Sequence, residues 1–250
     1  MNEAVIKFEE VWKYYPLYHY ITGGFKTFIF NLPKFIKQMH SNKFLALKNI
    51  SFEIQRGETF GIIGKNGAGK STILGLIAEV MKPSSGKIVV NGRVSPLLEL
   101  GAGFHSALTG RENIMLNGLI LGLDKKTVLN KTDEIIAFSE LGDLIEHPIR
   151  IYSSGMLTRL GFSIVVHLAP EILLIDEILT AVGDIDFQKK CLNKIKEFQK
   201  NGVTIVLVSH NIEDVKNICD RVMWIDNHQV NMIGDTASVL TKYTLGCPTA

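Results

Sequence analysis

The chain has 250 residues, of which 46% are hydrophobic and 21% are charged, and its formal net charge is +2. This composition is typical of a globular α/β protein and argues against disorder, and a nearly neutral chain gives no indication of a nucleic-acid partner. The three cysteines and seven histidines lack the spacing of a zinc site or a disulfide framework. No apolar run approaches the ~18 residues that span a bilayer, and the N-terminus lacks the pattern of a signal peptide. We therefore expect a cytoplasmic chain that cannot cross a membrane unaided.

The chain begins with two segments in which apolar and polar residues alternate as they do in strands. These segments are residues 5–8 and 50–54, and they predict a small antiparallel sheet near the N-terminus. The residues between them, from 14 to 41, are rich in aromatic side chains.

Within this aromatic stretch, an amphipathic insertion is expected at about residues 20–41. Its apolar side chains recur at helical spacing on one side: Phe25, Phe28, Ile29, Leu32, Phe35, Ile36 and Met39. Its polar side chains fall on or near the other side: Lys26, Asn31, Lys34, Lys37 and Gln38. Pro33 should kink or restart the helix. Such a helix could lie at a membrane surface or against a membrane protein, or it could pack on this protein's own core, and the pattern alone leaves both open.

The chain is organised around a complete G-x-x-x-x-G-K-S phosphate loop, Gly64-Lys65-Asn66-Gly67-Ala68-Gly69-Lys70-Ser71. A buried strand at 59–63 is predicted to enter the loop, and a helix at 72–77 is predicted to leave it. The glycines let the backbone curl so that its N–H groups face a phosphate, and the helix N-terminus adds a favourable field. Lys70 can reach the β- and γ-phosphates, and the Ser71 hydroxyl can ligate Mg²⁺. The loop therefore predicts that the protein binds a nucleoside triphosphate.

Beyond the loop, predicted helices and strands alternate along the chain. Thr109-Gly110-Arg111-Glu112 is a T-x-x-E capping box that opens a helix through about Leu121. The other predicted elements are a strand at 87–90, helices at about 126–139 and 154–168, a strand at 172–177, a helix at 187–200 and a strand at 203–208. This alternation predicts a parallel sheet with helices on both faces. Ligands of such sheets bind at the carboxyl ends of the strands, where Gly64, Asp176 and His210 fall.

The predicted strand at 172–177 ends in two carboxylates, Asp176 and Glu177. An apolar strand with this ending, downstream of a phosphate loop, is expected of an ATPase. Asp176 would hold Mg²⁺ directly or through water, and Glu177 could polarise the attacking water as general base. The alternative is an ordinary strand end with solvated carboxylates.

With these motifs in order, the chain resembles the ATP-binding subunits of ABC transporters over essentially its whole length. The resemblance is carried by the phosphate loop, the strand that ends in Asp176 and Glu177, His210, and the segment in the place of the family signature, Tyr152-Ser153-Ser154-Gly155-Met156. This segment departs from the usual Leu-Ser-Gly-Gly-Gln and keeps Ser154 and Gly155 near the Ser and second Gly positions.

Three segments resemble the polysaccharide-exporter branch of that family, which handles O-antigen, capsule and teichoic acid. They are the signature followed by Arg159-Leu160-Gly161-Phe162, the segment Leu98-Glu99-Leu100-Gly101-Ala102-Gly103-Phe104, and the segment Thr109-Gly110-Arg111-Glu112-Asn113. Each segment alone is a weak indication, and together they are specific.

The resemblance implies an α/β fold with a P-loop NTPase (RecA-like) core, a small N-terminal antiparallel β part and a helical subdomain at about residues 104–160. The whole chain, 1–250, would be a single ABC nucleotide-binding domain. Two copies would pair head to tail with two ATPs at the interface. Each ATP would contact residues 64–72 of one copy, from Gly64 to Thr72, and Ser153, Ser154 and Gly155 of the other. A helix that begins at Ser154 would present free N–H groups to the γ-phosphate.

The resemblance also assigns single residues to the chemistry. His210 would contact the γ-phosphate and orient the water, which makes Glu177, His210 and Lys70 the catalytic set. Taken alone, His210 could equally be a core residue at the end of a strand. Tyr15 would stack on adenine, although an aromatic residue there could also simply pack in the core.

Two positions depart from the family pattern. Glu99 stands where the family usually has a glutamine, and it would join Ser71 and Asp176 as a ligand of Mg²⁺ or its water. Asp184 lies one residue further from Glu177 than the family pattern has it, so its role at the dimer interface stays open.

Taken together, the sequence predicts the ATP-hydrolysing subunit of an exporter for a lipid-linked polysaccharide, most similar to O-antigen. It would act as a dimer with a transmembrane permease at the cytoplasmic face of the inner membrane, with ATP and Mg²⁺ as cofactors. The insertion at about 20–41 resembles a helix near the mouth of the transmembrane partner, and Leu100-Gly101 would contact that partner. The alternatives are an ABC transporter ATPase for another substrate and a soluble ABC ATPase without a transport role.

Overall fold

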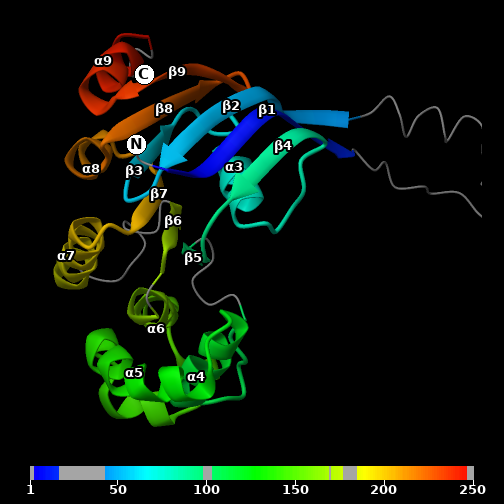
Figure 1. Cartoon of the computed structure of the whole chain (residues 1–250). Coiled ribbons are helices and arrows are strands. Elements are labelled where there is room, and N and C mark those ends of the chain that lie inside the picture. Colours follow the sequence, from blue (N-terminus) through cyan, green and yellow to red (C-terminus); the bar gives the residue numbers. More distant parts are fainter. Residues whose placement is uncertain (1–2, 17–42, 98–102, 169, 177–184, 247–250) are drawn as a thin grey trace, which may run out of the picture.

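The computed structural model describes residues 3–16, 43–97, 103–168, 170–176 and 185–246. Within these ranges the strands form two sheets, one antiparallel and one mainly parallel, and the helices gather on the larger sheet and in a separate lobe (Figure 1). The predicted α/β fold is therefore confirmed: a core with a phosphate loop, a small N-terminal antiparallel sheet and a helical subdomain. That residues 1–250 form a single nucleotide-binding domain stays a prediction.

The N-terminal sheet has the order β2-β1-β4, and its strands are antiparallel. Its strands are β1 (Ala4–Pro16), β2 (Lys43–Gln55) and β4 (Ser85–Val90). Strand β1 runs further than the sequence pattern predicts, because a register shift after Phe8 changes which side chains face inward. Glu10 takes a φ of 47° at this shift, and Val11 rather than Glu10 is the next buried residue. The start of the aromatic stretch, Tyr14 to Pro16, is therefore strand.

The larger sheet has the order β5-β6-β7-β3-β8-β9. Neighbours from β5 to β8 are parallel, and β9 is antiparallel to β8. The strands are β3 (Thr59–Ile63), β5 (Val94–Leu97), β6 (Ile172–Asp176), β7 (Thr204–Val208), β8 (Arg221–Asp226) and β9 (Gln229–Asp235). Of these strands, the sequence predicted β3, β6 and β7.

Both faces of this sheet are covered, which explains why β6 and β7 are apolar at nearly every position. One face packs on the N-terminal sheet and on α3 (Lys70–Ile77), with Phe60 and Leu174 in the core between them. The opposite face carries Leu173 and Leu207 and packs on helices. The helices there are α7 (Ile185–Lys200), α8 (Ile212–Ile218) and α9 (Thr236–Gly246), with the C-terminal part of α6 (Ser154–His167).

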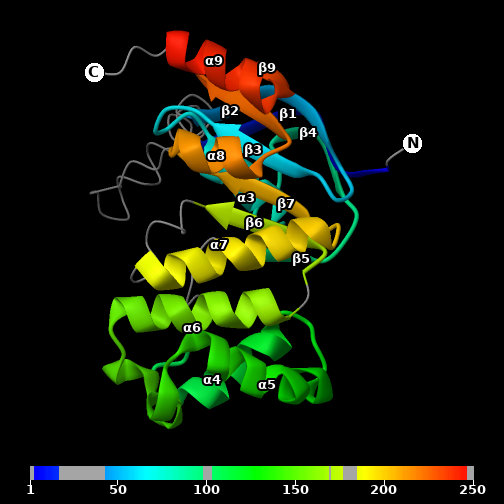
Figure 2. The same cartoon turned by 90° about the vertical axis from the view of Figure 1, so that its left-hand side faces the viewer.

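The helical subdomain consists of α4 (Gly110–Ile120), α5 (Lys125–Ser139) and α6, linked by 3₁₀ turns at Gly142–Glu146 and Ile149–Ile151. It has its own apolar core, which includes Ile114, Val128 and Leu160. Figure 2 shows α6 and α7 running alongside each other where this lobe meets the sheets.

The Thr109 to Asn113 motif builds the entrance to this subdomain. Thr109 and Glu112 form the predicted capping box: the Glu112 N–H donates to Thr109 Oγ1 at 3.1 Å, and the Thr109 N–H donates to Glu112 Oε2 at 2.8 Å. A Cβ at Gly110 would lie 2.6 Å from both Ile145 Cδ1 and the Tyr152 hydroxyl, so a larger residue there would displace these side chains. Asn113 is fully buried and pins the preceding loop, accepting from the His105 N–H and donating to three backbone carbonyls. The motif is therefore explained locally by capping and packing.

Candidate nucleotide-binding site

The phosphate loop joins the wholly buried strand β3 to helix α3, as the sequence predicts. Gly64 has a φ of 153°, and a Cβ there would overlap the carbonyl oxygen of Ile225 in β8. Gly69 is the N-cap of α3 with a φ of 112°, and a Cβ there would lie 2.6 Å from Leu47 Cδ2. Side chains are therefore excluded at both positions by conformation and by space. The loop can curl only because both residues are glycine.

Lys70, the first residue of α3, places its side chain inside the loop and hydrogen-bonds to the loop backbone. Its side chain is only 6% exposed, and its Nζ donates to the carbonyl oxygens of Gly64 at 2.8 Å and Lys65 at 3.2 Å. A buried ammonium must be compensated by such acceptors. The positive charge is thus held inside the loop, where it can attract the phosphates of a nucleotide.

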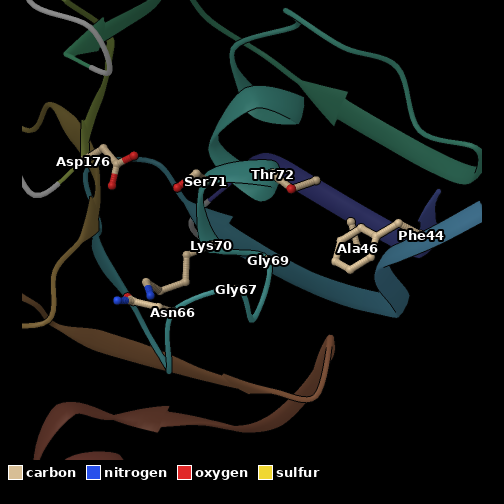
Figure 3. Close-up of a pocket in the computed structure, with 9 residues that line it drawn as sticks. All are labelled: Phe44, Ala46, Asn66, Gly67, Gly69, Lys70, Ser71, Thr72 and Asp176. Carbon is tan, nitrogen blue, oxygen red and sulfur yellow. The ribbon is translucent and has the colours of Figure 1, made fainter. Parts of the chain in front are cut away.

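A pocket of about 490 Å³ opens over the loop. Its lining comes from β2, the phosphate loop, the first turn of α3 and the end of β6: Phe44, Ala46, Asn66, Gly67, Gly69, Lys70, Ser71, Thr72 and Asp176. Figure 3 shows Phe44 at one end of this pocket and Asp176 at the other, with the loop between them. Of the predicted loop residues, Asn66, Gly67 and 69–72 line the pocket, whereas Gly64, Lys65 and Ala68 build the loop behind it.

The carboxyl ends of β6 and β3 bring two of the predicted metal ligands, Asp176 and Ser71, to one edge of the sheet. Asp176 pairs with Val208, and Val208 pairs on its other side with Ile62, just before the loop. Figure 3 shows the Asp176 carboxylate turned toward the Ser71 hydroxyl. A hydroxyl and a carboxylate oxygen are hard ligands of the kind that Mg²⁺ prefers, and the nucleotide phosphates and water supply the rest of its shell. The donor set therefore fits Mg²⁺, although the described residues contain no cluster of three or more His, Cys, Asp or Glu side chains that could hold a metal by themselves.

His210 follows β7 at the same edge, but it is exposed and is not among the described residues that line the pocket. Its backbone position is fixed by its neighbours. Ser209 is buried, and its Oγ accepts from the Asn211 N–H at 3.0 Å, while Asn211 caps α8 by accepting from the Glu213 N–H at 3.0 Å. Burial and the adjacent Glu213 raise the pKa of Asp214, and the side-chain hydrogen bond with Asn211 and then the nearby His210 oppose this rise.

The end of the pocket away from Asp176 holds an aromatic residue that the sequence reasoning missed. Phe44 in β2 lines the pocket with 47% of its surface exposed, and its ring meets His228 edge to face at 5.7 Å. Tyr15, the predicted adenine partner, pairs with Phe44 across the strands but does not line the pocket. Its hydroxyl instead donates to Met81 Sδ at 3.1 Å and lies 3.5 Å from Thr72 Oγ1. The sequence held no clear signal for Phe44, because its place opposite Tyr15 follows from a β1–β2 register that shifts several times.

The signature segment has the predicted local structure. Helix α6 begins at Ser154, and Ser153 caps it by accepting from the Met156 N–H at 3.3 Å. Ser153 and Ser154 are exposed and Gly155 is half-buried. None of these three is among the described residues that line the pocket. A single chain therefore brings the phosphate loop, Ser71 and Asp176 together and leaves the signature apart.

Several predicted site residues lie outside the described part of the chain. They are Glu99, Glu177 and Asp184, together with the segments around them and the amphipathic insertion at 20–41. Their assigned roles stay predictions.

These features define a P-loop nucleotide-binding cassette: a glycine loop around a buried lysine, a hydroxyl and a carboxylate side chain at a parallel-sheet edge, and a helical lobe with a capped helix of its own. A sequence model of this class, described as "ABC transporter", matches residues 47–180. The chain belongs to the ABC transporter family and is one of its ATPases.

Relatives and solved structures agree with this assignment. An "O-antigen export system ATP-binding protein RfbB" of Klebsiella pneumoniae is 53% identical over 241 residues, covering 96% of this chain and 98% of that protein. A "Teichoic acids export ATP-binding protein TagH" of Listeria innocua is 43% identical over 238 residues, covering 95% of this chain and 69% of that protein. The fold matches that of the dimeric ATP-binding cassette MJ0796 bound to ADP and Pi, with a TM-score of 0.72 at 20% identity, covering 92% of this chain and 98% of that chain.

The two aromatic residues give a first prediction. If Phe44 is the adenine platform, Phe44→Ala removes a stacking contact worth about 1–3 kcal/mol and weakens ATP binding about 5- to 150-fold. Binding of inorganic triphosphate, which has no base, should stay within about twofold of wild type by the same argument. The measurement is equilibrium binding of both ligands to each variant. If Tyr15→Leu weakened ATP binding and Phe44→Ala left ATP affinity unchanged, the stacking would instead be assigned to Tyr15.

Proposed function

We propose that this chain is the ATPase subunit of an exporter for a polysaccharide of the O-antigen type. The observation that carries the proposal is 53% identity, over nearly the whole of both chains, to a protein named as the ATP-binding part of an O-antigen export system. The relative named for teichoic acid export supports the same broad substrate class. We further propose that the exported polysaccharide is lipid-linked.

The proposed working unit is a head-to-tail dimer that docks on a transmembrane permease at the cytoplasmic face of the inner membrane. Support comes from the separation of the site within one chain, since Ser153, Ser154 and Gly155 do not line their own chain's pocket. In a head-to-tail pair these residues would close the pocket of the other copy, and the first N–H groups of α6 would face the γ-phosphate. Among the described residues no helix is long and apolar enough to cross the bilayer.

The proposed chemistry is hydrolysis of the γ-phosphoryl group. Lys70 neutralises phosphate charge from inside the loop, where its Nζ already lies 2.8 Å from the Gly64 carbonyl oxygen. Ser71 and Asp176 would hold Mg²⁺, with Glu99 as a further candidate, and the ion supplies charge neutralisation on the phosphates when bound. Glu177 takes the proton from the attacking water, and His210 orients that water against the γ-phosphate.

Glu177 provides the direct test of the hydrolytic step. Glu177→Gln keeps the size of the side chain but removes the base, so turnover should fall about 10²- to 10⁴-fold while ATP still binds. ATP hydrolysis and ATP binding are measured on the purified complex. Glu197→Gln, an exposed glutamate on α7, is the matched control and should hydrolyse ATP at the wild-type rate. Wild-type turnover in Glu177→Gln would refute the general-base role.

The transport role is tested by reconstitution with the transmembrane permease of the proposed exporter. We expect reconstitution with this permease to stimulate ATP hydrolysis strongly, because substrate and partner would drive closure of the dimer. Changing Phe28 and Phe35 together to Ser should abolish the stimulation, since it removes the apolar stripe of the insertion. If the chain alone hydrolysed ATP at the full rate and the permease had no effect, a soluble ABC ATPase would be favoured. The apolar side chains of the insertion would then be interpreted as packing on the protein's own core.

A further inference from the structure

Three helices meet at an aromatic cluster where the helical subdomain touches the core. Phe138 of α5 stacks on Phe162 of α6 with ring centroids 6.2 Å apart, and it meets Phe187 of α7 edge to face at 5.7 Å. Phe162 and Phe187 are in edge-to-face contact at 6.5 Å. Phe162 and Phe187 are fully buried, whereas Phe138 is half-buried. Figure 2 shows α6 and α7 facing each other where the helical subdomain meets the core.

Two cations cover this cluster, one from each side of the contact. The Arg159 guanidinium of α6 lies 4.7 Å from the ring centroid of Phe187 in α7. The Lys190 ammonium of α7 lies 4.6 Å from the ring centroid of Phe138 in α5 and donates to the Phe138 carbonyl oxygen at 2.9 Å. Each cation therefore reaches across from its own helix to an aromatic residue of another helix, which fixes their relative placement.

A single carboxylate joins the two cations. Glu140 Oε1 lies 2.7 Å from Lys190 Nζ, and Glu140 Oε2 lies 3.4 Å from an Arg159 guanidinium nitrogen. We refer to Phe138, Phe162, Phe187, Arg159, Lys190 and Glu140 as the cation–aromatic junction. Glu140 thus makes one ion pair within the helical subdomain and one to the core helix α7.

The backbone of Glu140 has the left-handed conformation, which glycine adopts more readily than glutamate. Glu140 is the C-cap of α5 with a φ of 57°, in the left-handed region where helices usually end on glycine or asparagine. A glutamate there is strained relative to glycine. Strain at a residue whose side chain makes specific contacts points to a role for that side chain.

The two helices joined by Glu140 lead to different ATP sites in the proposed dimer. Helix α6 begins at the signature residues Ser153 to Gly155, which would contact the nucleotide held by the other copy. Helix α7 begins at Ile185, directly after the segment 177–184 that carries Glu177 of the copy's own site. The junction therefore lies between the part of the chain that serves one ATP and the part that serves the other.

We propose that Glu140 is a positioning residue that couples the orientation of the signature helix α6 to α7, and so links the two ATP sites through one chain. This inference rests on the proposed dimeric ATPase. Exposed ion pairs contribute little to the stability of a folded chain. We therefore expect the junction to affect the relative orientation of α6 and α7. Without Glu140, the signature would be held less firmly relative to the segment that carries Glu177. A signature out of place lowers turnover in a closed dimer and leaves the phosphate loop, and hence ATP affinity, unchanged.

Glu140→Gly distinguishes a positioning role from a role in stability, because we expect it to lower kcat without lowering the Tm. Glycine relieves the left-handed conformation and should keep or raise the Tm of the chain. Loss of the carboxylate should lower kcat for ATP about three- to tenfold, the size expected for one or two ion pairs, with KM within about twofold of wild type. Glu140→Gln and Lys190→Met should lower kcat in the same way, and their combination should be no slower than the slower single variant.

Glu146→Gln is the matched control, since the Glu146 carboxylate pairs with Arg111 at 2.7 Å entirely within the helical subdomain. It should keep the wild-type kcat. The variants are compared in the reconstituted complex with the permease. A wild-type kcat in Glu140→Gly, or a fall in kcat accompanied by a matching fall in Tm, would overturn the inference.

A distance measurement tests the junction without any hydrolysis. Spin labels at Lys126→Cys in α5 and Lys196→Cys in α7, both exposed positions, report the placement of the lobe in a chain that also carries Cys247→Ser. Burial raises the pKa of the Cys191 and Cys219 thiols to about 12, so these native cysteines resist labelling. Glu140→Gly should broaden the distance distribution, and an unchanged distribution would overturn the inference. An inactive wild-type complex would refute the proposed function, while this measurement still decides on the junction.

Discussion

The structure of the site depends on the enclosure of one positive charge by a glycine loop. The Lys70 ammonium is buried and held by two loop carbonyls, and this is possible only because Gly64 and Gly69 allow the chain to turn tightly against β8 and β2. The neighbouring elements hold the two ends of the loop: the fully buried strand β3 fixes its start, and helix α3 continues from its end. The N-terminal sheet then supplies Ala46 and Phe44 to the same pocket.

The distribution of the site over the chain sets the requirements for catalysis. Ser71 and Asp176 lie at one sheet edge, while Ser153 to Gly155 begin a helix of a separate lobe. In the proposed dimer, a second copy of the chain therefore supplies the signature, and the angle between its lobe and its core sets where that signature lies. At the cation–aromatic junction, the ion pair of Glu140 with Lys190 at 2.7 Å joins the lobe to the core, and this contact is the basis of the role proposed for Glu140 in turnover.

The sequence predicted the parts of this structure in which local pattern and tertiary contact agree. The phosphate loop, the capping box at Thr109 and the helix start at Ser154 all depend on nearby residues, and all are confirmed. Other elements were missed for physical reasons. Strand β5 contains Pro96, which is tolerated because β5 is an edge strand, and the β8–β9 turn uses Asn227 and His228 at positive φ without the glycine that usually marks a hairpin. Phe44 was missed because its exposure to the pocket depends on packing between β2 and the loop, which the alternation of residues along a strand does not reveal.

The central claim is that each active site is built from two copies of the chain, and mixing two inactive variants tests it most directly. Lys70→Met disables the phosphate loop of its own chain, and Gly155→Asp disables the signature that its chain offers to a partner, since a carboxylate there would repel the γ-phosphate. Each variant alone should be inactive in the complex with the permease. Mixed together, they form some dimers with one site whose phosphate loop and signature are both intact, so ATP hydrolysis should return in part. Full activity of either variant alone, or no recovery in a mixture shown to contain mixed dimers, would contradict the account.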